Sequence, residues 1–222
     1  MVYWVSRVFC LTLLRLLWRP SVEGREHIPA DGPLVVASNH LSFIDSIIIP
    51  LVVPRKVVFL AKAEYWEGRS PAAWPRRLFF KAFEAVPVQR EQQQDAQASL
   101  DLARGVLERG DAFGIYPEGT RSRDGRLYRG RTGVGWLAVA AGAKVVPLGL
   151  VGTDKIQPVG ARMPRVHRGL TIRFGEPVDP ADYAGLPPGR ARREITDAVM
   201  DRIAALSGQE RAPGYNERPA TD

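Results

Sequence analysis

A histidine and an aspartate five residues apart are the side chains of this sequence best suited to acid–base chemistry. His40 and Asp45 lie in the stretch SNHLSFIDS, residues 38–46, directly ahead of an apolar run. A carboxylate bonded to one imidazole nitrogen fixes the tautomer of the ring and leaves the other nitrogen able to remove a proton from a hydroxyl. The spacing therefore suggests a general base with an orienting carboxylate.

The same stretch also has a purely structural interpretation. Ser42 is a favourable N-cap residue and Asp45 follows three positions later, so helix capping accounts for both without any function. The two interpretations are compatible, because an Asp in the first helical turn is held in place while His40 lies just outside the helix. One His and one Asp are too few ligands for a metal, so we expect no metal site here.

A second polar stretch, YPEGTRSRDGR, combines turn-forming and basic residues. Arg121 within it is suited to bidentate recognition of a phosphate group. Further arginines follow at positions 123, 126, 129 and 131, with only Asp124 to offset them. These residues form a basic loop, residues 117–131. It is either an anion-binding surface or an ordinary solvated loop.

The elements that must position these residues alternate along the chain. Short apolar runs predict strands over 34–37, 57–61, 85–88, 112–116, 145–151 and 170–174. Helical periodicity predicts helices over 43–53, 72–83, 93–109 and 132–141, with a closing helix through Ile195, Val199, Ile203 and Leu206. Strands alternating with helices favour an α/β domain with a largely parallel central sheet flanked by helices. Sites in such sheets collect at the carboxyl ends of strands, where Lys62 and Arg90 also fall, although either can be an ordinary surface charge.

Length and charge limit the classes of partner. The 222 residues suit one domain, which we place at 21–206, while residues 207–222 have no apolar period and are expected to be a disordered tail. A net charge of +7 and a pI near 9.9 favour polyanionic partners or simply solubility. Nucleic acid is not expected, because only Tyr128 interrupts the basic loop with an aromatic ring. The single cysteine, Cys10, indicates a reducing compartment.

Residues 1–20 are expected to form an amphipathic helix that ends at Pro20. Its apolar residues at helical spacing are Val5, Val8, Phe9, Thr12, Leu13 and Leu16. Arg7 and Arg15 interrupt the run well short of the roughly 20 residues that span a bilayer, and no signal-peptide pattern is present. The helix either lies in a membrane interface, with arginines facing an anionic lipid surface, or packs on its own domain.

Four blocks of this sequence, taken in order, resemble a known family. NHLSFID, VPVQR, YPEGTRS and VVPLGL resemble the conserved blocks of the glycerolipid acyltransferases, whose best-known members are the lysophosphatidate acyltransferases. The resemblance runs from about residue 22 to residue 174; its first and third blocks are specific, and the other two mean little alone. Tyr116 replaces the common Phe of the family, and RGRTG stands where many members have Lys before the Gly.

The resemblance implies acyl transfer from acyl-CoA or acyl carrier protein to the free hydroxyl of lysophosphatidic acid, giving phosphatidic acid for phospholipid biosynthesis. It implies direct attack without an acyl-enzyme or a cofactor, with His40 as the general base and Asp45 as its orienting partner. The implied substrate-binding residues are Asn39, Ser42, Lys62, Arg90, Glu118, Gly119, Thr120 and Arg121. Asn39 and Ser42 would shape the catalytic loop, and Arg121 would contact phosphate.

The expected location is the cytoplasmic face of the cell membrane, as a peripheral protein with a lysophospholipid acceptor. Two alternatives stay open at this point. One is an acyltransferase that acts on another lyso-lipid or on glycerol-3-phosphate. The other is a non-catalytic lipid-binding protein that relies on the positive charge.

Overall fold

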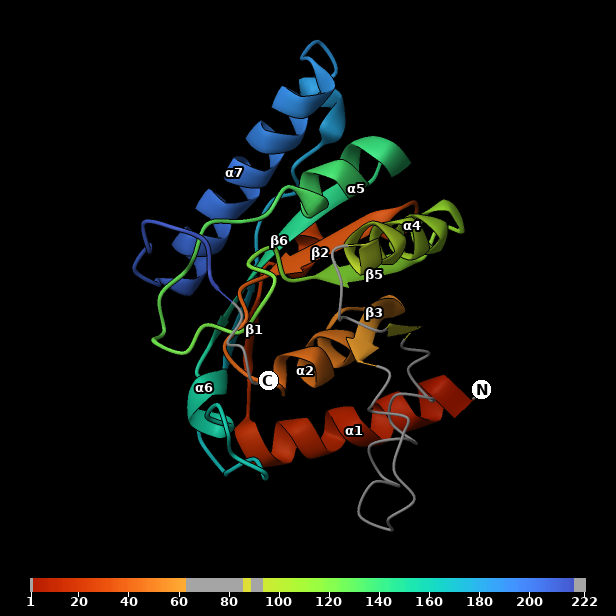
Figure 1. Ribbon diagram of the computed structural model, residues 1–222. Helices are drawn as coiled ribbons and strands as arrows, with labels where there is room; N and C mark the ends of the chain where they lie inside the picture. Colours follow the sequence, from red (N-terminus) through yellow and green to blue (C-terminus); the bar gives the residue numbers. More distant parts are fainter. Residues whose placement is uncertain (1, 63–85, 89–93, 218–222) are drawn as a thin grey trace.

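The computed structural model describes residues 2–62, 86–88 and 94–217 (Figure 1). Its strands form one sheet in the order β1-β7-β6-β2-β5-β3-β4. They are β1 (Ser21–Glu23), β2 (Leu34–Ser38), β3 (Val57–Lys62), β4 (Val86–Val88), β5 (Ala112–Ile115), β6 (Lys144–Val151) and β7 (Thr171–Phe174). Neighbouring strands run parallel except β6 and β7, which are antiparallel. The predicted α/β class with a largely parallel sheet is confirmed.

Helices cover both faces of the sheet. The α-helices are α1 (Val2–Trp18), α2 (Asp45–Val52), α4 (Gln94–Glu108), α5 (Gly133–Ala141), α6 (Thr153–Ile156) and α7 (Pro188–Ser207), joined by the 3₁₀ helices η1 (Arg25–His27) and η4 (Pro180–Tyr183). In Figure 1, α4, α5 and α7 lie on one side of the sheet, whereas α2 lies on the other with α1 beyond it. Strand β2 is buried on both faces, since Leu34 and Val36 join one core cluster and Val35 and Ala37 the other.

Most predicted elements agree with the structure to within two residues. The strands β1 and β7 extend the sheet beyond β6, and β1 was not predicted because three residues carry too short a pattern. The four-residue helix α6 was missed for the same reason. The helix predicted over residues 72–83 lies outside the described residues.

Helix α1 packs on the domain with the face opposite to its predicted apolar face. Leu14 is buried against the cluster that includes α2, whereas Val8, Phe9 and Leu16 are 65%, 64% and 70% exposed. Arg7 was expected among the basic residues that meet lipid, but its Nη2 donates to the carbonyls of Leu51 at 3.2 Å and Val53 at 2.6 Å. These carbonyls lie at the C-terminus of α2, where backbone acceptors lack partners within the helix.

No helix in the described part of the chain is both long and apolar enough to cross a membrane.

The segment after α7 is ordered against the basic loop, contrary to the predicted disordered tail. In this C-terminal segment, residues 208–217, the Glu210 carbonyl accepts from the Leu127 amide at 2.8 Å and the Ala212 amide donates to the Leu127 carbonyl at 2.9 Å. The Arg129 amide donates to the Gly214 carbonyl at 2.9 Å. Backbone hydrogen bonds hold the segment in place. Such bonds do not require an apolar pattern, so the sequence did not reveal them. Residues 218–222 lie outside the described residues.

Candidate active site

His40 and Asp45 meet at the carboxyl end of β2. His40 Nδ1 lies 2.9 Å from Asp45 Oδ2, with the carboxylate fully buried and the imidazole 15% exposed. An ionised carboxylate can only accept hydrogen bonds, so Nδ1 carries the hydrogen and Nε2 is the nitrogen able to take a proton. The predicted pairing of these two residues is therefore present, in the geometry that a general base requires.

The Asp45 carboxylate holds the loop that carries His40. Its Oδ2 also accepts from the backbone amides of Leu41 and Ser42, both at 2.8 Å. Three hydrogen bonds on one oxygen fix both the carboxylate and the chain on which the imidazole is mounted. The contacts also resemble the expected capping arrangement, because Ser42 Oγ accepts from the Ile44 amide at 3.4 Å while Asp45 accepts from the Ser42 amide, and the regular helix α2 begins at Asp45.

Ser42 and Asn39 support the site from inside the protein. Ser42 Oγ donates to the carbonyl of Gln157 at 2.6 Å, which joins the catalytic loop to the segment after α6. Asn39 Nδ2 donates to the Leu150 carbonyl at 2.9 Å and its Oδ1 accepts from the Leu150 amide at 2.8 Å, so this side chain extends the pairing of β2 with β6. Both residues are completely buried. These contacts fit the expectation that both residues shape the catalytic loop.

Glu118 joins the loop that carries His40 to the basic loop. Its Oε1 accepts from the His40 amide at 3.1 Å and its Oε2 accepts from the Tyr128 amide at 3.0 Å. The His40 carbonyl accepts from the Ser122 amide at 2.7 Å, so the basic loop contacts the His40 backbone on both sides. Glu118 is completely buried, and its two carboxyl oxygens hold the two loops together.

Burial raises the pKa of Glu118 from its ordinary value of 4.5 to about 7, although the amides of Tyr128 and His40 oppose this shift. The nearby negative charges of Asp45 and Asp124 add to the rise. The protonated carboxyl is therefore favoured in the folded state. Its contribution to stability is present below pH 4.5 and is lost as the pH rises through 7, a change of about 3 kcal/mol.

We expect Glu118→Gln to remove this pH dependence. Urea unfolding at pH 5 and pH 8 measures the free energy of unfolding of both proteins. The amide changes the hydrogen bonds equally at both pH values, so the difference between wild type and variant isolates the titration. Relative to the variant, the wild type should lose about 2.5 kcal/mol of unfolding free energy between pH 5 and pH 8. Parallel pH profiles of the two proteins would contradict the assignment.

Tyr116 contributes a contact that the sequence did not predict. Its ring stacks on the His40 imidazole with centroids 3.7 Å apart and an interplanar angle of 6°, and its hydroxyl lies 2.9 Å from Ser46 Oγ. Stacking on one ring face prevents the imidazole from tilting out of its plane. The hydrogen bond to Asp45 fixes its rotation within that plane. The hydroxyl that distinguishes Tyr from Phe binds the first turn of α2.

The backbone of the basic loop is held in place by contacts with Arg131 and with the C-terminal segment. Gly119 has φ +81°, a conformation that favours glycine, and a side-chain atom added there would approach Arg131 Nε to 3.1 Å. Arg131 Nη2 donates to the Asn216 carbonyl at 3.3 Å, while Asn216 Nδ2 donates to the Arg121 carbonyl at 3.1 Å. Thr120 is half-buried in the same turn. The C-terminal segment thus holds the backbone that carries Arg121.

Not every arginine of the loop is available to an anion. Arg126 pairs with Asp124 at 2.7 Å, and Asp124 Oδ2 also accepts from the Tyr128 hydroxyl at 2.9 Å. Arg129 and Arg131 lie over the ring of Tyr215, with guanidinium carbons 5.3 and 5.6 Å from its centroid. The positive field predicted for this region is therefore partly offset by Asp124.

Lys62 and Arg90 are the other two predicted cations. Lys62 is the last described residue before a gap in the structure. Lys62 is the last residue of β3, paired with Val88 of β4, so its backbone ends at the same edge of the sheet as His40. Arg90 lies outside the described residues. Among the residues that are described, no group of three His, Cys, Asp or Glu side chains could hold a metal ion.

Gln209 supports the site although it lies 170 positions along the chain from its partner Asn39. Its Oε1 accepts from Asn39 Nδ2 at 2.7 Å, and its Nε2 donates to the Gly125 carbonyl at 2.7 Å. One side chain therefore joins the end of β2 to the basic loop. Sequence inspection missed it because no pattern connects residues separated by 170 positions.

Comparisons with known proteins place this site in context. Residues 19–151, more than half of the chain, match the family described as Acyltransferase. A 1-acyl-sn-glycerol-3-phosphate acyltransferase of Bacillus subtilis is 28% identical over 207 residues, covering 90% of this chain and 96% of that protein. A chloroplastic 1-acyl-sn-glycerol-3-phosphate acyltransferase of Arabidopsis thaliana is 28% identical over 198 residues, covering 89% of this chain and 54% of its own length.

The human 1-acyl-sn-glycerol-3-phosphate acyltransferase alpha is 32% identical over 133 residues, which cover 59% of this chain and 44% of that protein. The chain thus spans about half the length of the plant and human relatives and nearly all of the Bacillus one. The crystal structure of PlsC, a 1-acyl-sn-glycerophosphate acyltransferase from Thermotoga maritima, matches with a TM-score of 0.65 and 24% identity. The match covers 92% of this chain and 83% of that one, and it supports the fold. From the extent of the family match, the chain belongs to the Acyltransferase family.

Proposed function

We propose that this protein transfers a fatty acyl group from a thioester donor, acyl-CoA or acyl carrier protein, to the free hydroxyl of lysophosphatidic acid, forming phosphatidic acid. The observation that carries the proposal is the fixed His40–Asp45 pair, whose loop is hydrogen-bonded through Glu118 and Ser122 to the loop that carries the arginines. The names of the relatives agree with this acceptor.

In the proposed reaction, His40 Nε2 removes the proton of the acceptor hydroxyl as its oxygen attacks the thioester carbonyl. An ester bond forms, the carbon–sulfur bond breaks, and the proton passes from the imidazolium to the departing thiolate. Asp45 stabilises the imidazolium between these steps. A thioester is already activated, so base assistance and positioning can suffice without a covalent intermediate.

The side chains near His40 are consistent with direct transfer. The hydroxyl of Ser42 is committed to the Gln157 carbonyl, and the only cysteine, Cys10, lies on α1 and packs against the core beneath α2. Burial raises the pKa of the Cys10 thiol, which lowers its fraction of nucleophilic thiolate. The thioester donor is a substrate, and the proposed reaction needs no cofactor.

Release of free thiol by the purified protein tests the function. The assay supplies acyl-CoA or acylated carrier protein with lysophosphatidic acid, other lysophospholipids or glycerol-3-phosphate. We expect release that depends on the acceptor and is fastest with lysophosphatidic acid. A faster rate with another acceptor would replace the proposed substrate, and the absence of acceptor-dependent release would leave a non-catalytic lipid-binding protein.

We further propose that α1 and the loop of residues 157–170 attach the protein peripherally to the cytoplasmic face of the cell membrane. The outward face of α1 presents Val8, Phe9 and Leu16, and Trp18 Nε1 donates to the Arg165 carbonyl at 2.8 Å. That loop exposes Met163 and Val166 at 75% and 73%. Apolar side chains mixed with arginines suit a bilayer interface with anionic lipid.

The double variant Phe9→Ser/Leu16→Ser should bind lipid vesicles at least about a hundredfold more weakly, because each lost apolar side chain contributes about 1.5–3 kcal/mol when fully buried in lipid. Vesicle co-sedimentation measures the partition coefficient. Leu102→Ser is the matched control, since Leu102 is 48% exposed on α4, across the sheet. Equal partitioning of the double variant and the control would contradict attachment through α1.

A further inference from the structure

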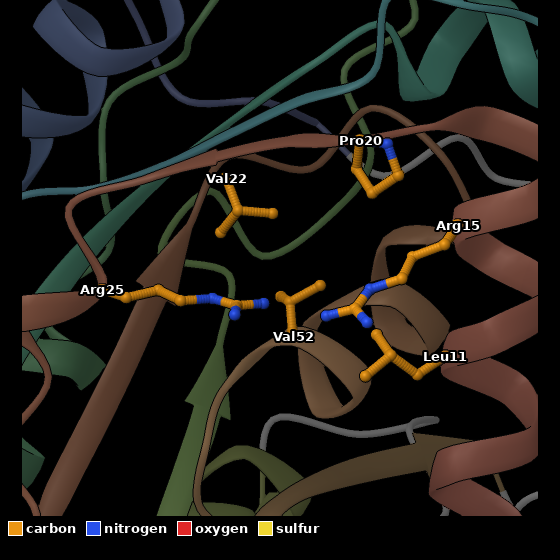
Figure 2. Close-up of a pocket in the computed structure, with 6 residues that line it drawn as sticks. All are labelled: Leu11, Arg15, Pro20, Val22, Arg25 and Val52. Atoms are coloured by element: carbon orange, nitrogen blue, oxygen red, sulfur yellow. The ribbon is translucent and has the colours of Figure 1, made fainter.

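A small pocket lies between α1, the β1–η1 turn and the end of α2. Its volume is about 240 Å³, and it is lined by Leu11, Arg15, Pro20, Val22, Arg25 and Val52. Figure 2 shows the side chains of Arg15 and Arg25 reaching toward one another from opposite walls, with Val52 between them. The pocket therefore combines an apolar lining with two guanidinium groups that face a common space.

Neither guanidinium pairs with an acidic side chain in the part of the chain that the structure describes. No acidic residue lines the pocket, and within the described residues neither side chain makes an ion pair or a hydrogen bond. Burial lowers the pKa of Arg25, and the positive charges of Arg15 and Arg7 lower it further. Two like charges held face to face repel each other, so an anion placed between them relieves the repulsion and accepts hydrogen bonds from both.

The pocket is separate from the candidate active site. Val52 is the last residue of α2, whereas Asp45, which binds His40, is the first. Eight helical residues put about 10 Å between these two ends. The pocket accordingly lies toward the opposite edge of the sheet from His40.

The surroundings of the pocket favour a lipid over a free ion. Arg15 lies on α1 seven residues from Val8, which is two helical turns along nearly the same line of the helix surface. It therefore borders the outward apolar face that carries Val8 and Leu16. A phosphate held by both arginines leaves the acyl chains of the same molecule beside apolar side chains.

We propose that this pocket binds the phosphate of an anionic membrane phospholipid, as a lipid site distinct from the catalytic one. The proposal rests on the attachment of α1 to the membrane. Arg15 comes from α1 and Arg25 from the turn after β1, so the bound phosphate ties the membrane helix to the sheet. The site thereby sets the orientation in which the domain lies on the bilayer.

Vesicle binding by Arg25→Gln tests the proposal. Arg109→Gln is the matched control, because Arg109 is an exposed arginine directly after α4, across the sheet, and its loss removes the same charge. We expect Arg25→Gln to bind phosphatidylcholine vesicles containing phosphatidylglycerol about tenfold more weakly than the control, as the loss of a charge-assisted hydrogen bond predicts. Binding to pure phosphatidylcholine should be equal for the two variants. Equal affinity for the anionic vesicles would overturn the proposal.

Soluble ligands separate the pocket from the membrane. Dihexanoyl phosphatidylglycerol, followed by calorimetry, should bind the wild type and Arg109→Gln but not Arg25→Gln, even if α1 fails to bind vesicles. Inorganic phosphate that binds as tightly as this lipid would show a general anion site and overturn the lipid assignment. Thiol release in detergent should keep the same KM for the acceptor in Arg25→Gln. An increased KM would place the pocket in the catalytic site and also overturn the proposal.

Discussion

The variant His40→Ala should lose acyl transfer by about 10²–10⁴-fold in kcat, because it removes the group proposed to take the proton from the acceptor hydroxyl. The Asp45 carboxylate would keep its hydrogen bonds from the amides of Leu41 and Ser42, so the loop should stay folded. The loss should therefore appear in kcat with little change in the KM for the acceptor. Thiol release at saturating acceptor measures it.

Two further variants make this prediction specific to the pair. His27→Ala is the matched control, since it removes another imidazole whose Nδ1 lies 3.0 Å from the Phe174 carbonyl, near η1. Its kcat should stay at the wild-type value. Asp45→Asn keeps the shape of the side chain but cannot stabilise an imidazolium by charge, so it should also lower kcat. Because the two residues act as one unit, the double variant should be scarcely slower than His40→Ala. Retention of half the wild-type rate by His40→Ala would exclude the proposed base.

The pairing of His40 with Asp45 could be predicted because both residues lie in one short loop between a strand and a helix. Five positions of chain leave few conformations in which the side chains are far apart. The predicted capping contacts are present as well, since Ser42 Oγ accepts from the Ile44 amide and the Ser42 amide donates to Asp45, although the regular helix α2 begins only at Asp45. The sequence therefore identified the residues of this loop. It did not predict that one oxygen of Asp45 would bind the imidazole and two backbone amides together.

The burial of Glu118 could not be predicted from its neighbours along the chain. Its carboxylate binds the amide of His40, 78 positions away, because β2 and β5 are adjacent parallel strands whose carboxyl ends meet. Periodicity predicts such strands but not their order in the sheet. The contact of Glu118 with the His40 loop therefore leaves no signal in the sequence around residue 118.

The residues named for the apolar face of α1 do not include Leu14, which packs the helix on the domain, and the pattern did not fix which side of the helix faces the domain. An amphipathic helix can turn its apolar face to its own domain or to a membrane, and both choices fit the same spacing. Leu14 lies on the side toward α2, and Arg7 binds the carbonyls at the end of that helix. These contacts exist only once α2 is in place, so they leave no trace in the local sequence.

The C-terminal segment offers the second large effect. Ending the chain after Ser207 removes the backbone hydrogen bonds that Glu210, Ala212 and Gly214 make with the basic loop, together with the bonds of Gln209 to Asn39 and Gly125. Each bond contributes about 0.5–1.5 kcal/mol, so the loss of these bonds should lower the free energy of unfolding by about 2.5–7.5 kcal/mol. The loop that carries Arg121 would then no longer be held in one conformation. We expect the KM for the phosphorylated acceptor to rise about tenfold or more, as measured by thiol release.

Ending the chain after residue 217 provides the matched control, because it keeps all of these contacts and removes only the last five residues. Its kinetic constants and unfolding should match those of the full chain. The point variant Asn216→Ala separates stability from function, since it loses one bond to the Arg121 carbonyl while the backbone pairing with Leu127 persists. It should raise the KM for the acceptor with a loss of only about 1 kcal/mol in stability. A folded protein that ends at Ser207 and retains the wild-type KM would show that the basic loop orders itself, and that the C-terminal segment has no part in acceptor binding.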